Sequence, residues 1–268
     1  MDPTVAITGA TSGIGRAVAD AFVEAGAFVA VCGRDGDAVD RTVAALNGNR
    51  EPAAGREPAA GREHTRDGDG VDDGDGLGDG DAVATEAAGR AWGARVDVRD
   101  EFDLERFFER VAREAGPIDV VLANAAVLHG SPGDRPADET SYADFDDTMR
   151  TNARGVFATI REALPHLAAD ARVIVPSGSV AHESKPGMGA YATSKAAAEA
   201  VARGFAADVD ATVGVVDPGL VATDLTGMER ARNPDSVAPL FVWAATDAPA
   251  ADLNGGRIGL REWKAATR

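Results

Sequence analysis

A tyrosine and a lysine lie four residues apart in the segment AYATSKAAA, residues 190–198. This spacing places Tyr191 and Lys195 on one face of a helix, one turn apart. A free phenol, with a pKa of about 10, transfers protons poorly at neutral pH. A neighbouring ammonium group favours the phenolate, and the lowered pKa suits a general acid or base in carbonyl and alcohol chemistry. Because such pairs also occur on solvated helix faces, the hypothesis depends on the elements around the pair.

A glycine-rich turn stands near the start of the chain. The apolar run Val5–Thr8 predicts a strand, and GATSGIG follows at residues 9–15. Apolar residues then recur at helical spacing from Ile14 to Ala25, before a second strand-like run at 27–31. In this context glycines let the backbone approach a pyrophosphate at a helix N-terminus. The segment therefore predicts a nucleotide site.

Strand and helix patterns alternate along the rest of the chain. Strands are expected at 94–96, 118–123, 172–177, 211–216 and 256–260, and helices at 144–164, 190–207 and 237–245. This order predicts an α/β fold, a doubly wound, Rossmann-like parallel sheet in a single domain over residues 1–268. Ligands of such sheets bind beyond the carboxyl ends of the strands. Gly9, Asn124, Ser177 and Pro218 all fall at those ends.

Six motifs, in order over residues 8–224, resemble those of the short-chain dehydrogenase/reductase family. Besides the glycine turn and the Tyr191/Lys195 pair, they are Asp97-Val98, Asn124-Ala125-Ala126-Val127, Asn152 in TNARGVF, and Pro218–Asp224. Ala126 stands where the family usually has glycine.

The resemblance implies an NAD(P)-dependent oxidoreductase that moves a hydride reversibly between a nicotinamide and a carbonyl or secondary alcohol. The catalytic residues that it implies are Asn152, Ser177, Tyr191 and Lys195. The cofactor-binding residues that it implies are Gly9, Thr11, Ser12, Gly13, Ile14, Gly15, Arg34, Asp97, Val98, Asn124, Tyr191, Lys195, Pro218, Gly219, Val221 and Thr223.

The same resemblance assigns roles to the catalytic residues. Tyr191 exchanges a proton with the substrate oxygen, Lys195 lowers the pKa of Tyr191 and holds the nicotinamide ribose, and Asn152 anchors a water that links Lys195 to solvent. The serine that binds the substrate oxygen stays open, because the family's usual spacing to the tyrosine falls on Gly178. Ser177 is preferred because the predicted strand ends there, and Ser179 is the alternative.

Cofactor preference depends on Cys32-Gly33-Arg34-Asp35, at the end of the second predicted strand. An acid at this place would bond the 2′-hydroxyl of NAD, whereas an arginine accepts the 2′-phosphate of NADP. Gly33 occupies the place of the acid and Arg34 follows it, which predicts NADP. Asp35 keeps NAD as the alternative, and Ser12 stands where some NADP-dependent relatives carry a basic residue.

The chain is strongly acidic, with 27 Lys and Arg against 44 Asp and Glu and a formal net charge of −17. Such a charge argues against nucleic acid or an anionic membrane as partner. The acid-rich, lysine-poor composition resembles that of enzymes from salt-loving archaea. At molar salt the Debye length is about 3 Å, so the repulsion among the acidic groups is screened. Cys32, the single cysteine, excludes an intrachain disulfide and a cysteine-clustered metal site, and no metal is expected.

The location and partners follow from the same features. No apolar run reaches about eighteen residues and no signal peptide is visible, so a cytoplasmic protein is expected. The expected partners are a small carbonyl or alcohol substrate and further copies of the chain, in a homodimer or homotetramer.

Residues 49–82 form a different kind of sequence. The hexapeptide EPAAGR occurs twice, at 51–56 and 57–62, and an Asp-Gly run follows from Asp67. Since this stretch has ten acids, four arginines and almost no apolar residues, burial cannot offset its ordering entropy. It is predicted to be a disordered acidic insertion within the single domain. A calcium loop is rejected, because Gly78 stands at the twelfth position from Asp67, where a bidentate glutamate is needed.

Two rival functions remain. A sugar-nucleotide epimerase or dehydratase would need a longer C-terminal part than the 45 residues after Thr223. A non-catalytic, NADP-binding regulator on the same fold would be marked by a broken catalytic set, whereas Asn152, Tyr191 and Lys195 are all present. Fold alone does not separate these functions.

Overall fold

The computed structural model describes residues 3–48 and 89–268. The predicted acidic insertion at 49–82 lies outside these described residues. The strands are β1 (Thr4–Thr8), β2 (Phe28–Gly33), β3 (Arg90–Arg95), β4 (Ile118–Leu122), β5 (Leu167–Pro176), β6 (Thr212–Asp217) and β7 (Arg257–Gly259). The α-helices are α1 (Gly13–Glu24), α2 (Gly36–Gly48), α3 (Glu101–Ala115), α4 (Tyr142–Met149), α5 (Gly155–Ala163), α6 (Gly189–Asp208), α7 (Ala238–Thr246), α8 (Ala250–Leu253) and α9 (Leu260–Ala266).

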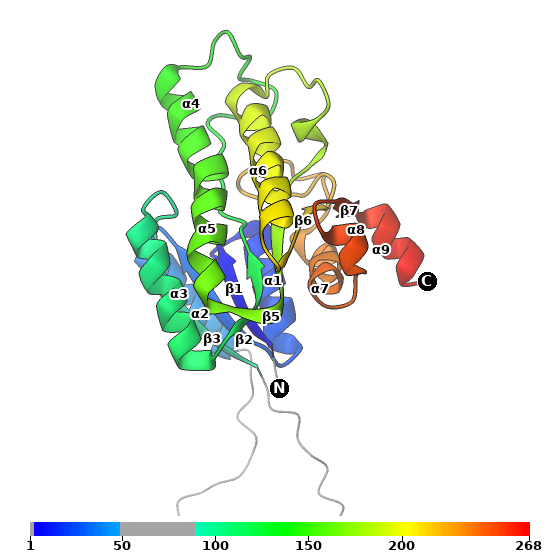
Figure 1. Cartoon of the computed structure of the whole chain (residues 1–268). Coiled ribbons are helices and arrows are strands. Elements are labelled where there is room, and N and C mark those ends of the chain that lie inside the picture. Colours follow the sequence, from blue (N-terminus) through cyan, green and yellow to red (C-terminus); the bar gives the residue numbers. More distant parts are fainter. Residues whose placement is uncertain (1–2, 49–88) are drawn as a thin grey trace, which may run out of the picture.

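The strands form one parallel sheet in the order β3-β2-β1-β4-β5-β6-β7 (Figure 1). The chain winds outward from β1 to β3, returns to β4 beside β1, and then winds outward in the other direction to β7. This reversal opens a crevice at the carboxyl ends of β1 and β4, where ligands of doubly wound sheets bind. The predicted fold class is therefore confirmed, and this crevice positions the site.

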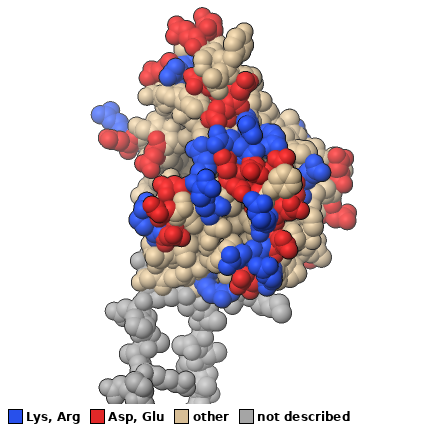
Figure 2. Space-filling view, turned by 90° about the vertical axis from the view of Figure 1, so that its left-hand side faces the viewer, with Lys and Arg blue, Asp and Glu red and all other residues tan. Residues whose placement is uncertain are grey.

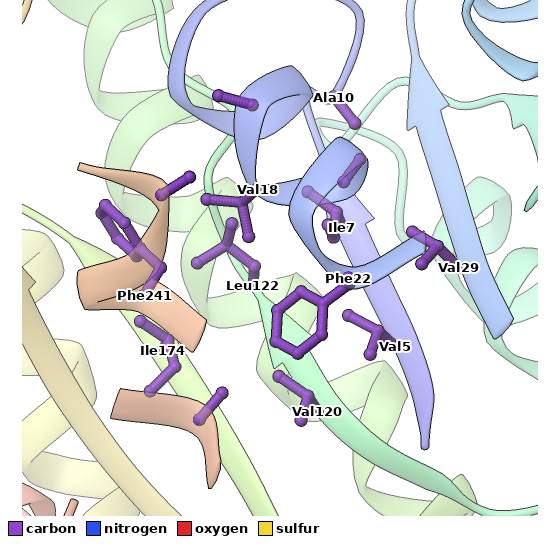
Figure 3. Packing of buried hydrophobic residues seen from close by; sticks show 14 of the residues in the cluster. Val5, Ile7, Ala10, Val18, Phe22, Val29, Val120, Leu122, Ile174 and Phe241 are labelled. Carbon is purple, nitrogen blue, oxygen red and sulfur yellow. The ribbon is translucent and has the colours of Figure 1, made fainter. Parts of the chain in front are cut away.

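Two layers of helices cover the sheet, and each buries an apolar core. On one face, Val18 and Phe22 of α1 and Phe241 of α7 pack on strand residues such as Ile7 and Leu122 (Figure 3). On the other face, apolar side chains of α3, α5 and α6 cover the opposite side of the same strands. Full burial of one such large apolar side chain stabilises the fold by about 1.5–3 kcal/mol. Within the described part of the chain, no helix combines the length and apolar character needed to cross a bilayer.

The helix expected at 144–164 is present but not uniform. Between α4 and α5, residues Arg150–Arg154 form a π-helical turn. A π-helical turn holds an extra residue and is frequent at functional sites. Here it carries Thr151 and Asn152 toward the interior, where both are buried. Because apolar periodicity reports the average pitch of a helix, this widened turn was not predicted.

An asparagine fastens the end of α2 to the start of β3. The side-chain amide of Asn47 donates to the carbonyl oxygen of Ala91 at 2.9 Å, and the amide oxygen accepts from the N–H of Ala91 at 2.9 Å. This pair of bonds mimics the ladder of a β-sheet. It holds together the two chain segments that flank residues 49–88.

Candidate active site

The glycine turn after β1 is shaped by crowding that only glycine tolerates. Gly9 has φ +66°, and a Cβ there would lie 2.7 Å from the Cα of Ala125. A Cβ on Gly15 would collide with the carbonyl oxygen of Gly9 and with the side-chain amide of Asn124. That amide donates to the carbonyl oxygens of Thr8 at 3.1 Å and Gly9 at 2.8 Å. Asn124 therefore holds the glycine turn in place through its hydrogen bonds to the backbone.

The start of α1 is open to an anion. Ser12 is the N-cap residue, in extended conformation, but its side chain makes no capping bond, and the first turn carries no acidic residue. The first N–H groups of a helix lack partners within the helix and carry its positive dipole end. Because Gly13 and Gly15 carry no side chains there, a pyrophosphate can approach these N–H groups closely.

Two adjoining cavities gather most of the predicted site residues. A cavity of about 270 Å³ is lined by Gly9, Thr11, Ser12, Gly13, Ile14, Arg34, Val98, Asn124 and Thr223, as predicted for cofactor binding. A second cavity, of about 460 Å³, is lined by Ser177, Tyr191, Lys195, Pro218, Gly219 and Val221. Ile14, Asn124 and Thr223 line both, so the two spaces adjoin. The predicted residues that line neither are Gly15, Asp97 and Asn152.

Several residues that line the first cavity were not predicted. They are Gly33, Val96, Ala125, Ala126, Val127, Thr151 and Leu225. Thr151 is notable because its hydroxyl oxygen is buried and has no hydrogen-bond partner among the described residues. A buried polar group without a partner is costly, so a ligand in this cavity has a polar atom to satisfy. The π-helical turn places Thr151 here.

Asp97 is among the residues predicted to bind the cofactor, and its carboxylate accepts hydrogen bonds from Arg99. The guanidinium of Arg99 lies 2.6 Å from Asp97 and 2.7 Å from Asp147 on α4. Its hydrogen bond lowers the pKa of the Asp97 carboxyl. Val96 and Val98, the neighbours of Asp97, line the cavity instead.

The carboxyl ends of β2 and β3 bring two arginines together. Arg34 follows β2, and Arg95 ends β3 with its Nε donating to the carbonyl oxygen of Arg34 at 3.1 Å. Arg95 was not predicted as a site residue. The carboxylate of Asp35 accepts from the N–H of Ala38 at 3.0 Å, so it caps the start of α2. Asp35, which was the reason for keeping NAD as the alternative cofactor, thus has a structural role.

Tyr191 and Lys195 share one face of α6, but the predicted lowering of the Tyr191 pKa is wrong. Burial raises the pKa of Tyr191 to about 12, and no charged neighbour lowers it. Burial also lowers the pKa of Lys195 to about 8. The ammonium lies 5.7 Å from the centroid of the Tyr191 ring and donates to the carbonyl oxygen of Pro176 at 3.0 Å. Residue spacing could not predict this, because it reports neither desolvation nor competing acceptors.

Asn152 is fully buried, and its side chain makes three hydrogen bonds. Its oxygen accepts from the N–H of Val127 at 2.7 Å, and its nitrogen donates to the carbonyl oxygen of Val127 at 2.9 Å and to the hydroxyl of Ser194 at 3.0 Å. Asn152 thereby joins the loop after β4 to α6.

The two candidate serines bond to different partners. Ser177, at the end of β5, is buried and donates to the carboxylate of Glu199 at 2.6 Å. Ser179 begins a 3₁₀ turn and accepts from the ammonium of Lys185, which also pairs with Glu183 at 3.3 Å. The pKa of the Glu183 carboxyl is lowered by Lys185 and, to a smaller degree, by Ser179. Both serines line the second cavity with Tyr191.

Comparison with known proteins agrees with this geometry. Residues 73–242 match the family model described as enoyl-(acyl carrier protein) reductase, and residues 3–58 match the model described as short chain dehydrogenase. A short-chain type dehydrogenase/reductase from Picea abies is 27% identical over 279 residues, which cover 94% of this chain and 91% of that protein.

Solved structures share the fold. An alcohol dehydrogenase from Thermococcus sibiricus, complexed with 5-hydroxy-NADP, matches with a TM-score of 0.72 and 24% identity over 96% of this chain and 95% of that one. A 3-ketoacyl-(acyl-carrier-protein) reductase from Brucella melitensis, complexed with NADH, matches with a TM-score of 0.73 and 20% identity over 96% of each chain. Six motifs in order, a cradle for a pyrophosphate and two family models that together span most of the sequence lead to one conclusion. The chain belongs to the short-chain dehydrogenase/reductase family and is an NAD(P)-dependent oxidoreductase.

Proposed function

We propose that this protein is an NADP(H)-dependent carbonyl reductase and alcohol dehydrogenase in which Tyr191 is the general acid and base. The observation that supports this most is the cavity lined by Tyr191, Lys195 and two serines, which adjoins the cavity at the glycine turn. When bound, the nicotinamide would supply the hydride in reduction and accept it in oxidation.

Tyr191 donates the proton to the carbonyl oxygen in the reducing direction. A pKa of about 12 keeps its phenol protonated over the neutral range, which suits a proton donor. Proton donation leaves a phenolate, and the Lys195 ammonium stabilises this anion. Because the pKa of Lys195 is about 8, reduction should be fastest below this pH and should decline above it, as the ammonium loses its charge.

Ser179 is the better candidate for binding the substrate oxygen, with Ser177 as the alternative. The Ser177 hydroxyl is directed to the buried Glu199 carboxylate, and giving up that bond would remove one of the two side-chain donors to a buried acceptor. The partners of Ser179 are half exposed, so solvent can replace it when it turns to a substrate. Asn152 contributes by holding the loop after β4 against α6. The proposal also keeps a water anchored by Asn152 that links Lys195 to solvent.

NADP is proposed as the preferred cofactor. Arg34 and Arg95 place two guanidinium groups at the ends of β2 and β3, where a 2′-phosphate is recognised in this fold. Asp35 caps α2, so its carboxylate is already occupied. A bulkier residue at Gly33 would press on Thr11, because a Cβ there would lie 3.0 Å from the Thr11 methyl group.

The substrate is proposed to be a small carbonyl or alcohol compound with an apolar body. Besides the catalytic groups, the second cavity is lined by apolar side chains such as Pro132, Met188, Leu220, Leu225 and Met228. A cytoplasmic homodimer or homotetramer is part of the proposal. Exposed aromatic side chains, Phe102 on α3 and Phe157 on α5, support association of copies.

The test is a panel of aldehydes, ketones and secondary alcohols assayed with NADPH or NADP in molar potassium chloride. Wild-type protein should turn over at least one compound. Tyr191→Phe keeps the ring but removes the transferable proton, so turnover should fall about a hundredfold or more. Tyr142→Phe, at a highly exposed position, is the matched control and should retain turnover. Undiminished turnover by Tyr191→Phe would refute the mechanism, whereas cofactor binding without any turnover would favour a regulator.

A further inference from the structure

An ion pair joins Glu199 on α6, which is buried, to Arg257 on β7, which is half-buried. The carboxylate of Glu199 accepts from the guanidinium of Arg257 on β7 and from the hydroxyl of Ser177 at 2.6 Å. The side chain of Glu199 is 11% exposed and that of Arg257 is 27% exposed. Neither residue was singled out in the sequence, although Glu199 follows Lys195 by one helical turn, as Lys195 follows Tyr191.

Arg257 connects this pair to both loops that border the second cavity. Its guanidinium lies 3.5 Å from the carboxylate of Asp217 at the end of β6, and 3.2 Å from the imidazole of His182. It also donates to the carbonyl oxygen of Gly178, between the two candidate serines, at 3.5 Å. Asp217 in turn accepts from the N–H of Gly219 at 2.9 Å. The loops after β5 and β6 are thus fastened to one guanidinium.

We propose that Glu199 and Arg257 are positioning residues of this active site. The pair fixes the serine loop and the Pro218-Gly219 loop relative to α6, and it sets a carboxylate one helical turn from the Lys195 ammonium. The expected effect on catalysis rests on the proposed function, whereas the expected effect on the titration of Lys195 does not.

The charges around Lys195 explain why the carboxylate matters. Burial lowers the pKa of Lys195, and Glu199 is the charged group that opposes this effect. Tyr191, on the same helix, is the neighbouring phenol. Arg257 from β7 contacts the carboxylate of Glu199. Asp217 from β6 and His182 from the loop after β5 contact Arg257 in turn. Glu199 therefore favours the charged lysine, whereas Arg257 weakens this effect by neutralising Glu199.

The two partners should consequently shift the titration of Lys195 in opposite directions. Glu199→Gln keeps an oxygen that can accept from Ser177 and Arg257 but removes the charge, so the midpoint should fall by about 0.5 to 1 pH unit. Arg257→Met removes the opposing cation, so the midpoint should rise. Arg257→Lys retains a cation and should stay close to wild type. A role confined to packing would not produce shifts of opposite sign.

The chain is suited to a direct measurement, because it contains three lysines: Lys185, Lys195 and Lys264. Protein labelled with ¹³C at the lysine ε-carbon would give three titration curves by NMR, without substrate or cofactor. Lys185→Arg and Lys264→Arg would assign them, and the Lys264 curve is the internal reference. Glu101→Gln, which breaks the 2.8 Å pair with Arg154 near the start of α3, is the control for loss of a surface ion pair.

The kinetic measurement would follow carbonyl reduction against pH. The decline of kcat/KM should begin at lower pH in Glu199→Gln and at higher pH in Arg257→Met. Arg172→Met is the control for Arg257, because Arg172 is likewise a half-buried strand arginine, bonded to the carbonyl oxygens of Ala244 and Ala248. It should lower stability and leave the pH profile unchanged.

Lys195 midpoints that coincide in wild type and Glu199→Gln, or that move in the same direction in both variants, would overturn the inference. Opposite shifts seen by NMR together with a wild-type protein inactive on every panel compound would retain the electrostatic role of the pair and refute the proposed function. If Glu199→Gln does not fold, the sign of the Arg257→Met shift decides.

Discussion

The hydroxyl groups of Ser177 and Ser179 stand two residues apart in the chain but in different surroundings. Ser177 is bonded to a buried carboxylate that belongs to the ion pair with Arg257. Ser179 is bonded to Lys185, whose side chain is 44% exposed. These surroundings support the proposal that Ser179 binds the substrate oxygen, whereas Ser177 fastens the loop after β5.

Replacing each serine by alanine separates these roles. Ser179→Ala should lower kcat by about tenfold or more, because one hydrogen bond to the developing charge is lost, while stability and cofactor affinity stay unchanged. Ser177→Ala should lower the unfolding midpoint, since Glu199 loses a buried donor worth about 1–3 kcal/mol. Steady-state kinetics and thermal unfolding of both variants provide the measurement. A large loss of kcat in Ser177→Ala with unchanged stability would assign the catalytic role to Ser177.

At this scale the sequence predicted which residues meet, but not their state. Tyr191, Lys195 and the serines do line one cavity, because motifs at strand ends and on a helix face converge in a parallel sheet. The pKa of Tyr191 moved the opposite way from the prediction, because burial acts on it more strongly than its neighbours do. The pairing of Glu199 with Arg257 was not predicted, because the two residues are 58 positions apart in the chain. Spacing within one helix does not reveal such a pair.

The ends of β2 and β3 form the part of the sheet edge that is proposed to distinguish NADP from NAD. Parallel pairing aligns Gly33 with Arg95, so the residue after β2 and the last residue of β3 lie side by side. The sequence predicted Arg34 from its place after a strand. Arg95 was missed because its relevance depends on register, which becomes known only when the strands are paired.

Arg34→Ala and Arg95→Ala should each weaken NADPH binding by about tenfold, because a charge-assisted bond to the 2′-phosphate is lost. NADH binding should change little, since NADH has no phosphate there. The effect should diminish as salt rises, as for any exposed ionic contact. Fluorescence titration with both cofactors measures this, and Arg41→Ala on α2 is the control. Equal losses for NADPH and NADH would remove the basis for the proposed preference.

At the scale of the whole molecule, one face mixes charges of both signs. On the side formed by α3, basic and acidic side chains alternate (Figure 2). Pairs such as Arg106–Asp103 at 2.6 Å and Arg154–Glu101 at 2.8 Å belong to this face. Exposed pairs of this kind contribute little stability each, with a median of about 0–1 kcal/mol. We therefore expect the salt dependence of this chain to come from repulsion within the overall net charge of −17, not from the ion pairs of this face.

Deleting residues 48–81 and joining the ends with a short Gly/Ser link should leave fold and turnover intact. The segment is polar and repetitive, and the Asn47–Ala91 bonds hold its flanks together without it. The deletion removes ten acids and four arginines and changes the formal charge from −17 to −11, so a requirement for salt should persist. Thermal unfolding and activity across potassium chloride concentration provide the measurement.

Either loss of folding or loss of the salt requirement would show that the segment is structural or is itself the halophilic element. Stabilisation of the full-length protein, but not of the shortened one, by calcium would show that a metal loop was wrongly rejected. Asn47→Ala in the shortened protein should lower its stability, because the flanks then lose both bonds.

The bonds between Asn47 and Ala91 also suggest that the chain can be divided. One piece, residues 1–48, would carry β1, β2 and the glycine turn, and the other, residues 89–268, would carry β3 to β7 and Tyr191. Since β1 and β2 lie between β3 and β4 in the sheet, neither piece can complete its core alone. Reassembly of the two pieces would restore the cavity that they share, so enzymatic turnover would serve as a split reporter of their association.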